Sequence, residues 1–211
     1  MTRILIIGAG GHAQVIADLI LCRARLGENV QLLGFVDDNP SLLGREILGV
    51  KVLGLIAQAT EFEPEAVIVG IGDNVTRARV YQQLKARGAT FGTAIHPRAV
   101  IADNVEMGEG SVVFANAVIN TGSIVGPNVI VNTGATIDHH ARIGAHVHIT
   151  PGVHLGGTVT VEEGAFLGIG SSVIPNRTIG AWSTVGAGAV VNHDVPPNTT
   201  VVGVPAKPLQ K

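Results

Sequence analysis

From residue 101 onward, aliphatic side chains recur at every sixth position of the chain. The series runs without an inserted loop, and a second series of mostly small residues follows each member by four positions. A period of six fits neither the turn of an α-helix nor the alternation of a simple strand. It is typical of a parallel β-helix built from hexapeptides. The members of the first series are Ile101, Met107, Val113, Ile119, Val125, Val131, Ile137, Ile143, Ile149, Leu155, Val161, Leu167, Val173, Ile179, Val185 and Val191.

Three such hexapeptides form one triangular coil, so residues 101–191 predict a prism of about five coils with both series pointing inward. At a spacing of roughly 4.8 Å between stacked strands, the prism would be about 24 Å long. Arg177 is the one large residue of the second series. An ordinary β-sandwich would instead show turns every ~8–12 residues and alternating runs. The tail after Val191 is expected to close the open end of the prism.

Residues 1–95 follow a different pattern, in which short apolar runs alternate with segments of helical periodicity. Strands that alternate with helices indicate a small parallel α/β unit. His96-Pro97 ends this pattern, so we expect one domain over residues 1–95 and a second over 96–211. The expected elements are strands at Arg3–Ile7, Leu32–Val36, Val50–Leu53 (an edge strand) and Ala66–Ile71, and helices at His12–Arg25 and Asn74–Arg87, the second capped by Asp73-Asn74 and stopped at Gly88.

Composition narrows the class of protein. Hydrophobic residues make up 46% of the chain and aromatic residues only 3%, with 28 glycines, which suits a narrow and regular interior. The net charge of −2 gives no reason to expect nucleic acid or an anionic membrane as a partner. A single cysteine, Cys22, fits a reducing compartment. Neither a signal peptide nor an apolar stretch of ~18–20 residues is recognisable, so we expect a cytoplasmic protein.

Five of the eight histidines lie between residues 139 and 154. None of the five occupies an inward position of the repeat, so we expect them outside the core. A solvated surface cluster is one interpretation. A metal site is another, but consecutive hexapeptides lie on different faces, so one chain does not gather these ligands and we expect no metal. The third interpretation is acid–base chemistry. Asp138-His139-His140 is the most suggestive constellation for it, because a carboxylate can orient a neighbouring imidazole.

Seven motifs along the chain carry a family resemblance: Gly8-Ala9-Gly10-Gly11-His12, Val36-Asp37-Asp38, Ile71-Gly72-Asp73-Asn74, Asn132-Thr133-Gly134-Ala135, Ile137-Asp138-His139, Phe166-Leu167-Gly168 and Gly203-Val204-Pro205-Ala206-Lys207. Together they resemble the bacterial nucleotide-amino-sugar N-acetyltransferases of the PglD/NeuD type, which are hexapeptide-repeat acyltransferases, along the whole chain. The resemblance implies a left-handed β-helix, whereas parallel crossovers are right-handed in nearly all other folds. It also implies acetyl-CoA as cosubstrate, a nucleotide-linked amino sugar as acceptor, and a role in surface glycan synthesis.

The resemblance assigns His139 as the general base that deprotonates the sugar amine. The family usually has an acidic residue directly after this histidine, and here that position is His140. Either Asp138 or another group then supplies the partner of the base, or the base is less strongly polarised. Residues matching the family's acetyl-CoA site, with the Gly157 amide as oxyanion donor, are His148, Gly157, Ile169, Ala187, Gly203 and Lys207. This cofactor would lie between neighbouring prisms of a homotrimer.

In the first domain, the resemblance implies a nucleotide-sugar site formed by Gly10, Gly11, His12, Asp37, Asp38 and Gly72. Glycines let a backbone approach a pyrophosphate, and the following helix offers free amides at its positive end. A glycine motif followed by an acidic residue about 25 positions later also suggests NAD. However, 95 residues have room for roughly half a dinucleotide fold. A tight turn that binds nothing is the third interpretation.

Two further functions stay open beside amino-sugar N-acetylation. One is a sugar O-acetyltransferase, for example acting on a sialic acid. The other is a prism without catalytic activity that serves as a scaffold or a sugar-nucleotide-binding module, which the absence of an acid at His140 favours. Because the repeat carries no inserted loop, substrate choice is expected to reside in residues 1–95.

Overall fold

The structure is a computed structural model that describes residues 1–209. The chain divides into two compact units, Met1–Pro97 and the part that begins at Arg98. This division falls two residues beyond the boundary expected from the sequence. Among the described residues, no helix is both long and apolar enough to cross a membrane.

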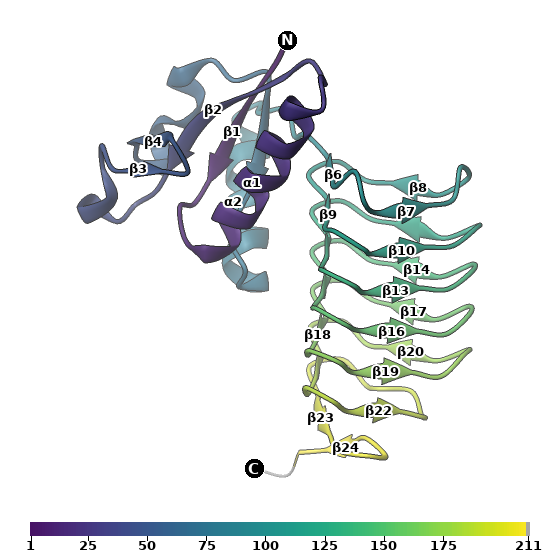
Figure 1. The fold of residues 1–211 in the computed structure, drawn as a ribbon. Coiled ribbons are helices and arrows are strands. Elements are labelled where there is room, and N and C mark those ends of the chain that lie inside the picture. Colours follow the sequence, from purple (N-terminus) through teal and green to yellow (C-terminus); the bar gives the residue numbers. More distant parts are fainter. Residues whose placement is uncertain (210–211) are drawn as a thin grey trace. The chain divides into compact units, whose positions relative to one another are not determined.

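The first unit is a five-stranded sheet with the strand order β3-β4-β2-β1-β5 and a helix after β1 and after β5 (Figure 1). β4, β2, β1 and β5 are parallel, and β3 is antiparallel to β4. The parallel α/β prediction is therefore confirmed. The elements are β1 (Thr2–Ile7), α1 (Gly11–Arg25), β2 (Val30–Val36), η1 (Pro40–Leu42), β3 (Glu46–Ile47), β4 (Val50–Gly54), η2 (Ile56–Phe62), β5 (Ala66–Val69), α2 (Asn74–Ala86) and β6 (Ala94–Ile95).

One expectation for this sheet was wrong. The segment Val50–Leu53, expected at the edge, forms β4 inside the sheet, because the two-residue strand β3 pairs with its outer side. Such a short strand gives no detectable periodicity. The caps of α2 match the sequence: the Asp73 side chain accepts a hydrogen bond from the Thr76 amide, and Gly88 adopts a φ of 81° just after the helix. β5 is buried along its whole length, as expected for a strand of a parallel sheet that is covered on both faces.

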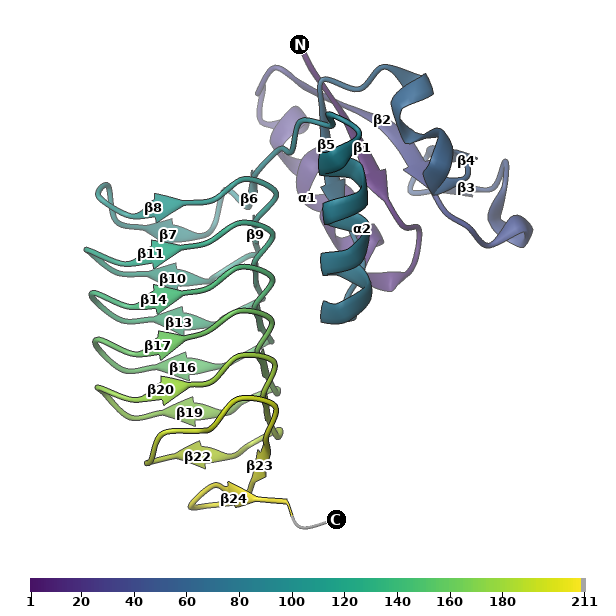
Figure 2. The same ribbon diagram turned by 180° about the vertical axis from the view of Figure 1, so that it is seen from behind.

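From Arg98 onward the chain forms a left-handed parallel β-helix, seen from two sides in Figures 1 and 2. Two-residue strands stack into three sheets. Sheet 1 contains β7 (Val100–Ile101), β10 (Val118–Ile119), β13 (Thr136–Ile137), β16 (His154–Leu155), β19 (Ser172–Val173) and β22 (Val190–Val191). Sheet 2 contains β8 (Glu106–Met107), β11 (Ile124–Val125), β14 (Arg142–Ile143), β17 (Thr160–Val161) and β20 (Thr178–Ile179). Sheet 3 includes β9 (Val112–Val113), β12 (Ile130–Val131), β15 (His148–Ile149), β18 (Phe166–Leu167), β21 (Thr184–Val185), β23 (Thr200–Val202) and β24 (Lys207–Pro208).

The register of the strands explains the sequence repeat. Ile119 pairs with Ile137, and Ile137 pairs with Leu155, so each residue lies against the residue 18 positions later. Both inward series fill the core, as expected; Ile137 and Ala141, for example, are fully buried. The aliphatic side chains stack into one continuous cluster from Val113 to Val201. Burial of this apolar cluster is the main term that stabilises the prism.

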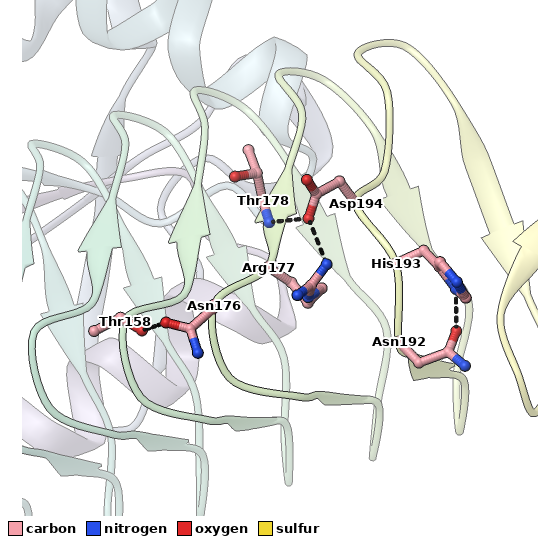
Figure 3. Close-up of polar contacts among 7 residues, drawn as sticks. All are labelled: Thr158, Asn176, Arg177, Thr178, Asn192, His193 and Asp194. Carbon is pink, nitrogen blue, oxygen red and sulfur yellow. Dashed lines mark hydrogen bonds and ion pairs between the residues drawn. The ribbon is translucent and has the colours of Figure 1, made fainter.

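The C-terminal end of the prism is closed by the tail after Val191, as expected. β23 continues sheet 3 on β21, and β24 folds back antiparallel to β23. At the end of sheet 2, the Asp194 carboxylate accepts a hydrogen bond from the Thr178 amide at 3.0 Å and lies 3.6 Å from the Arg177 guanidinium (Figure 3). Arg177 is thus half-buried at an inward position of the repeat, with its guanidinium directed toward Asp194.

Candidate active site

The three predicted catalytic residues lie at one corner of the prism, in the turn between β13 and β14. We call the turns between sheets 1 and 2 the first corner. The equivalent residues of this corner in successive coils, 18 positions apart, are Asn104, Gly122, His140, Thr158 and Asn176. His140, Thr158 and Asn176 all have left-handed φ angles, of 58°, 58° and 60°. Figure 3 shows Thr158 hydrogen-bonded to Asn176 one coil further along this corner.

The His139 imidazole lies directly against Gly157 in the next coil. A Cβ atom added to Gly157 would be 2.6 Å from both Nε2 and Cε1 of His139. A glycine is therefore needed at position 157 for the imidazole to lie there. The recorded hydrogen bonds of the described chain use the Gly157 carbonyl, which accepts from Asn176 N and Thr158 Oγ1. No hydrogen bond of residues 1–209 is recorded from the Gly157 amide.

The partner of His139 within the corner is His140. The two Nδ1 atoms are 3.0 Å apart, and the rings meet edge to face with centroids 5.2 Å apart. One nitrogen carries the hydrogen and donates, and the other accepts. The His140 ring lies over Gly122 of the preceding coil, where an added Cβ would be 2.8 Å from Cδ2. Glycines above and below thus leave room for the two imidazoles.

The Oδ1 of Asp138 does not contact the imidazole of His139 but accepts two other hydrogen bonds. This oxygen accepts hydrogen bonds from the His139 amide at 2.7 Å and from Asn120 Nδ2 at 3.0 Å. The bond from the His139 amide, together with that from Asn120, holds the pKa of Asp138 below its usual value. Asp138 is therefore a fixed negative charge that shapes the turn. Asn120 was not found from the sequence, where nothing but its spacing of 18 from Asp138 pointed to it.

The expectation that all five clustered histidines lie outside the core needs a correction. His146 and His148 are only 2% and 7% exposed. His146 occupies a corner between sheets 2 and 3, where its Nδ1 is 2.8 Å from Asn128 Nδ2 of the preceding coil. His148 points outward from β15, and its ring meets the edge of Phe166 at 5.3 Å. Outward positions of a stacked sheet are thus covered by their own neighbours in adjacent coils.

Apart from Gly157, the predicted acetyl-CoA residues form a second group. Ile169 and Ala187 occupy the same corner between sheets 3 and 1, one coil apart, and both are exposed, Ile169 by 62%. Gly203 and Lys207 lie in the exposed terminal segment around β23 and β24, where Gly203 has a φ of 94°. His148 lies on β15 in sheet 3, one of the two sheets that meet at this corner. Within one chain, these residues are on a different corner from His139.

The glycine-rich loop of the first unit is organised by Asp37. Its carboxylate accepts hydrogen bonds from the amides of Ala9 and Asn39, both at 2.8 Å. Asp38 accepts from the Ile56 amide at 3.0 Å and borders a cavity of about 450 Å³. Cβ atoms added to Gly10, Gly11 and Gly72 would meet nothing within 4 Å. These glycines therefore face open space, and α1 begins at Gly11 with amides that suit an anion.

A buried arginine supports the segment Ile71-Gly72 and was not found from the sequence. Arg77 of α2 is fully buried and donates from Nη1 to the carbonyls of Ile71 and Gly72, at 3.3 and 3.2 Å. Burial lowers the pKa of Arg77 to about 10. Burial, and then the charge of Arg77, lower the pKa of His12 to about 4. His12 is therefore neutral at physiological pH. From the sequence, Arg77 near the start of a capped helix could not be distinguished from an ordinary solvated arginine.

Residues 1–209 contain no group of three or more His, Cys, Asp or Glu side chains placed to hold a metal ion. The corner with its two imidazoles and adjacent glycine amide contains the parts of an acid–base site.

Known proteins with a similar sequence and structure show which family has this architecture. Residues 3–84 match the family model of the PglD N-terminal domain. The acetyltransferase domain of PglB from Neisseria gonorrhoeae superposes with a TM-score of 0.91 at 37% identity, over 99% of this chain and 100% of that one. PerB from Caulobacter crescentus, solved with CoA and GDP-perosamine, superposes with a TM-score of 0.88 at 40% identity, over 100% and 98% of the two chains.

Curated sequences give shorter matches. The UDP-N-acetylbacillosamine N-acetyltransferase of Bacillus subtilis is 34% identical over 117 residues, which are 54% of this chain and 52% of that protein. A putative acetyltransferase of Schizosaccharomyces pombe is 58% identical over 43 residues, 21% of its length. The chain thus spans about half or less of the curated relatives that it matches.

A left-handed prism of hexapeptides with a histidine at its corner defines an acyltransferase of the hexapeptide-repeat class. The glycine-rich α/β unit that precedes the prism narrows this class further. With full-length likenesses at 37% and 40% identity, the chain belongs to the PglD-type family of sugar acyltransferases.

Proposed function

We propose that this protein transfers the acetyl group of acetyl-CoA to the amino group of a nucleotide-linked 4-amino-deoxysugar, with a UDP, dTDP or GDP carrier, for surface glycan synthesis. The observation that carries the proposal is the position of the His139 Nε2 beside Gly157. The base then lies against a glycine whose amide has no recorded acceptor, and a base and a main-chain donor are the two groups that attack on a thioester needs. The related structure of PerB, which contains CoA and GDP-perosamine, supports this substrate class.

In the proposed reaction, the amine nitrogen attacks the thioester carbonyl, and a C–N bond forms as the C–S bond breaks. His139 Nε2 takes the proton from the attacking nitrogen. The Gly157 amide donates to the carbonyl oxygen while it carries negative charge. The protonated His139 returns its proton to the departing CoA thiolate, which leaves the base ready for another cycle.

The remaining residues have binding roles in this proposal. His148, Ile169 and Ala187 would line the path of acetyl-CoA, with Gly203 and Lys207 near its adenine end. His139 lies on another corner, so the site would form between prisms of a homotrimer. Light scattering tests this directly: a mass of three chains supports it, and a monomer that is fully active contradicts it. The glycines that face open space, Gly10, Gly11 and Gly72, with His12, Asp37 and Asp38, would hold the nucleotide sugar.

The test is the release of CoA thiol from acetyl-CoA with a panel of UDP-, dTDP- and GDP-linked 4-amino sugars. We expect turnover with at least one amine, and a loss of ~10²–10⁴-fold in kcat for His139→Ala. His154→Ala is the matched control, because His154 is an exposed histidine of the same prism, on sheet 1. Activity on hydroxyl acceptors with none on amines would replace the proposal with O-acetylation. Equal inactivity of wild type and variant would favour a scaffold.

A further inference from the structure

We propose that His140 is a positioning residue that fixes the tautomer of the His139 base, so that the two imidazoles act as one proton-binding unit. The inference rests on the proposed function. Its geometric basis is the 3.0 Å contact between the two Nδ1 atoms, at the point where Asp138 is engaged elsewhere, with the His139 amide and Asn120.

The direction of this hydrogen bond follows from the task of the base. His139 must have a lone pair on Nε2, the nitrogen that lies against Gly157. Its hydrogen is then on Nδ1 and is donated to His140 Nδ1. His140 must therefore accept at Nδ1 and have its own hydrogen on Nε2. A neutral imidazole thus does what a carboxylate does in other histidine bases: it holds the ring and selects one tautomer.

A neutral acceptor and a carboxylate differ in one measurable respect. Both accept from Nδ1–H, but only the carboxylate adds a negative charge that stabilises the imidazolium. Protonation of His140 also reverses the hydrogen bond, because its Nδ1 then donates. His139 would be forced to accept at Nδ1 and to have its hydrogen on Nε2, where it no longer works as a base. We call the imidazoles of His139 and His140 the dyad. The dyad therefore loses its activity as a base when it binds its first proton.

The surroundings of the dyad allow this reasoning. The following coil presents Gly157 and the preceding coil Gly122, neither of which has a side chain. The ionised group recorded beside the dyad in residues 1–209 is Asp138, whose charge acts on His139. A change at position 140 is therefore expected to reach the base mainly through the bond between the two rings.

The experiment compares two variants by their pH profiles of kcat. His140→Phe keeps a ring but removes the acceptor, and His140→Glu supplies a charged acceptor. We expect His140→Phe to lose ~10–100-fold in kcat, with the KM of each substrate within about threefold of wild type. The midpoint of the acid limb should move down for His140→Phe and up for His140→Glu, by about one pH unit for the charged acceptor. His154→Phe, on sheet 1, is the control and should leave the profile unchanged.

The outcomes separate the dyad from the proposed function. If His139→Ala is inactive and both His140 variants, folded by circular dichroism, keep the wild-type midpoint, the dyad is overturned and the base assignment stands. If His139→Ala is fully active, the base assignment itself fails. An ordered shift of the midpoints, from Phe through His to Glu, supports the dyad, because a merely structural role of His140 would lower the amount of folded enzyme without moving its profile.

Discussion

The substitution Gly157→Ala tests whether the imidazole of His139 is held in place by the absence of a side chain. The added Cβ would lie 2.6 Å from Nε2 and Cε1 of His139, where ordinary contacts begin at 3.4 Å. The ring must therefore move by about 0.8 Å, the difference between these two distances. Gly157 is not among the glycines with positive φ, so its backbone accepts alanine and the amide is retained. The perturbation thus acts on the position of the base.

A misplacement of about 1 Å of a catalytic group costs roughly 10²-fold in rate, which corresponds to about 2.7 kcal/mol of activation free energy. We therefore expect kcat of Gly157→Ala to fall about 100-fold, while its thermal midpoint stays within a few degrees of wild type. The assay is thiol release at saturating acetyl-CoA and amino sugar.

The control is a double-mutant cycle with His139→Ala. If the alanine acts by displacing the imidazole, it adds little once the imidazole is gone. A full 100-fold effect in the His139→Ala background would refute the reasoning and assign the loss to the Gly157 amide or the corner itself. Wild-type kcat in the single variant would show that the ring is free to move without consequence.

The first unit gives three further predictions. Arg77→Met removes the donor to the carbonyls of Ile71 and Gly72, so we expect the free energy of unfolding in urea to fall by ~2–3 kcal/mol and the KM for the nucleotide sugar to rise. Arg79→Met, at an exposed position of the same helix, should change the free energy of unfolding by no more than ~0.5 kcal/mol. Equal effects of the two substitutions would contradict the role of Arg77. Burial, and then the charge of Arg77, lower the pKa of His12 in the folded protein to about 4, below its ordinary value of 6.5. The unfolded state therefore binds the proton first, and stability falls as the pH falls from 6.5 toward 4. Urea unfolding should show a loss of about 2 kcal/mol between pH 7.5 and 5 that His12→Gln does not show, and an identical slope in both proteins would rule this out. Asp73→Ala removes the cap on the Thr76 amide and should cost α2 about 1 kcal/mol in the same assay, while Asp73→Asn retains most of it; no difference between the two would argue against the cap.

The sequence was sufficient to predict the prism because its rule is periodic and local. A coil of 18 residues places the same slot on the same face each time, so the buried state of Ile137 or Ala141 follows from counting. Arg177 occupies an inward position of the repeat, but its side chain is only half-buried. It directly precedes β20, the last named strand of sheet 2. The tail segment that bridges Ile179 at Val195 brings Asp194 to 3.6 Å from the guanidinium. The exception appears where the repeat ends.

Other features depended on contacts that no periodicity encodes. His146 is buried although it is outside both inward series, because it packs on Asn128, which is 18 residues earlier but on a corner. Arg77 is buried because a helix that starts at Asn74 turns its side chain toward the carbonyls that precede the helix. Corner packing and buried charges are set by three-dimensional proximity, so the hydrophobic pattern does not reveal them.

The paired imidazoles show most clearly what a motif leaves open. Neighbouring residues of an extended chain direct their side chains to opposite faces, so Asp138-His139-His140 in extended form would separate the two rings. The left-handed φ of His140, 58°, turns the chain at this residue and allows its Nδ1 to lie 3.0 Å from that of His139. The same conformation is available to Thr158 and Asn176 further along the corner, so the backbone is a property of the coil. What is specific to this coil is the pair of residues placed on it. The chemistry of the site therefore depends on the left-handed corner conformation, which the repeat supplies, and on the histidine that this sequence has at position 140.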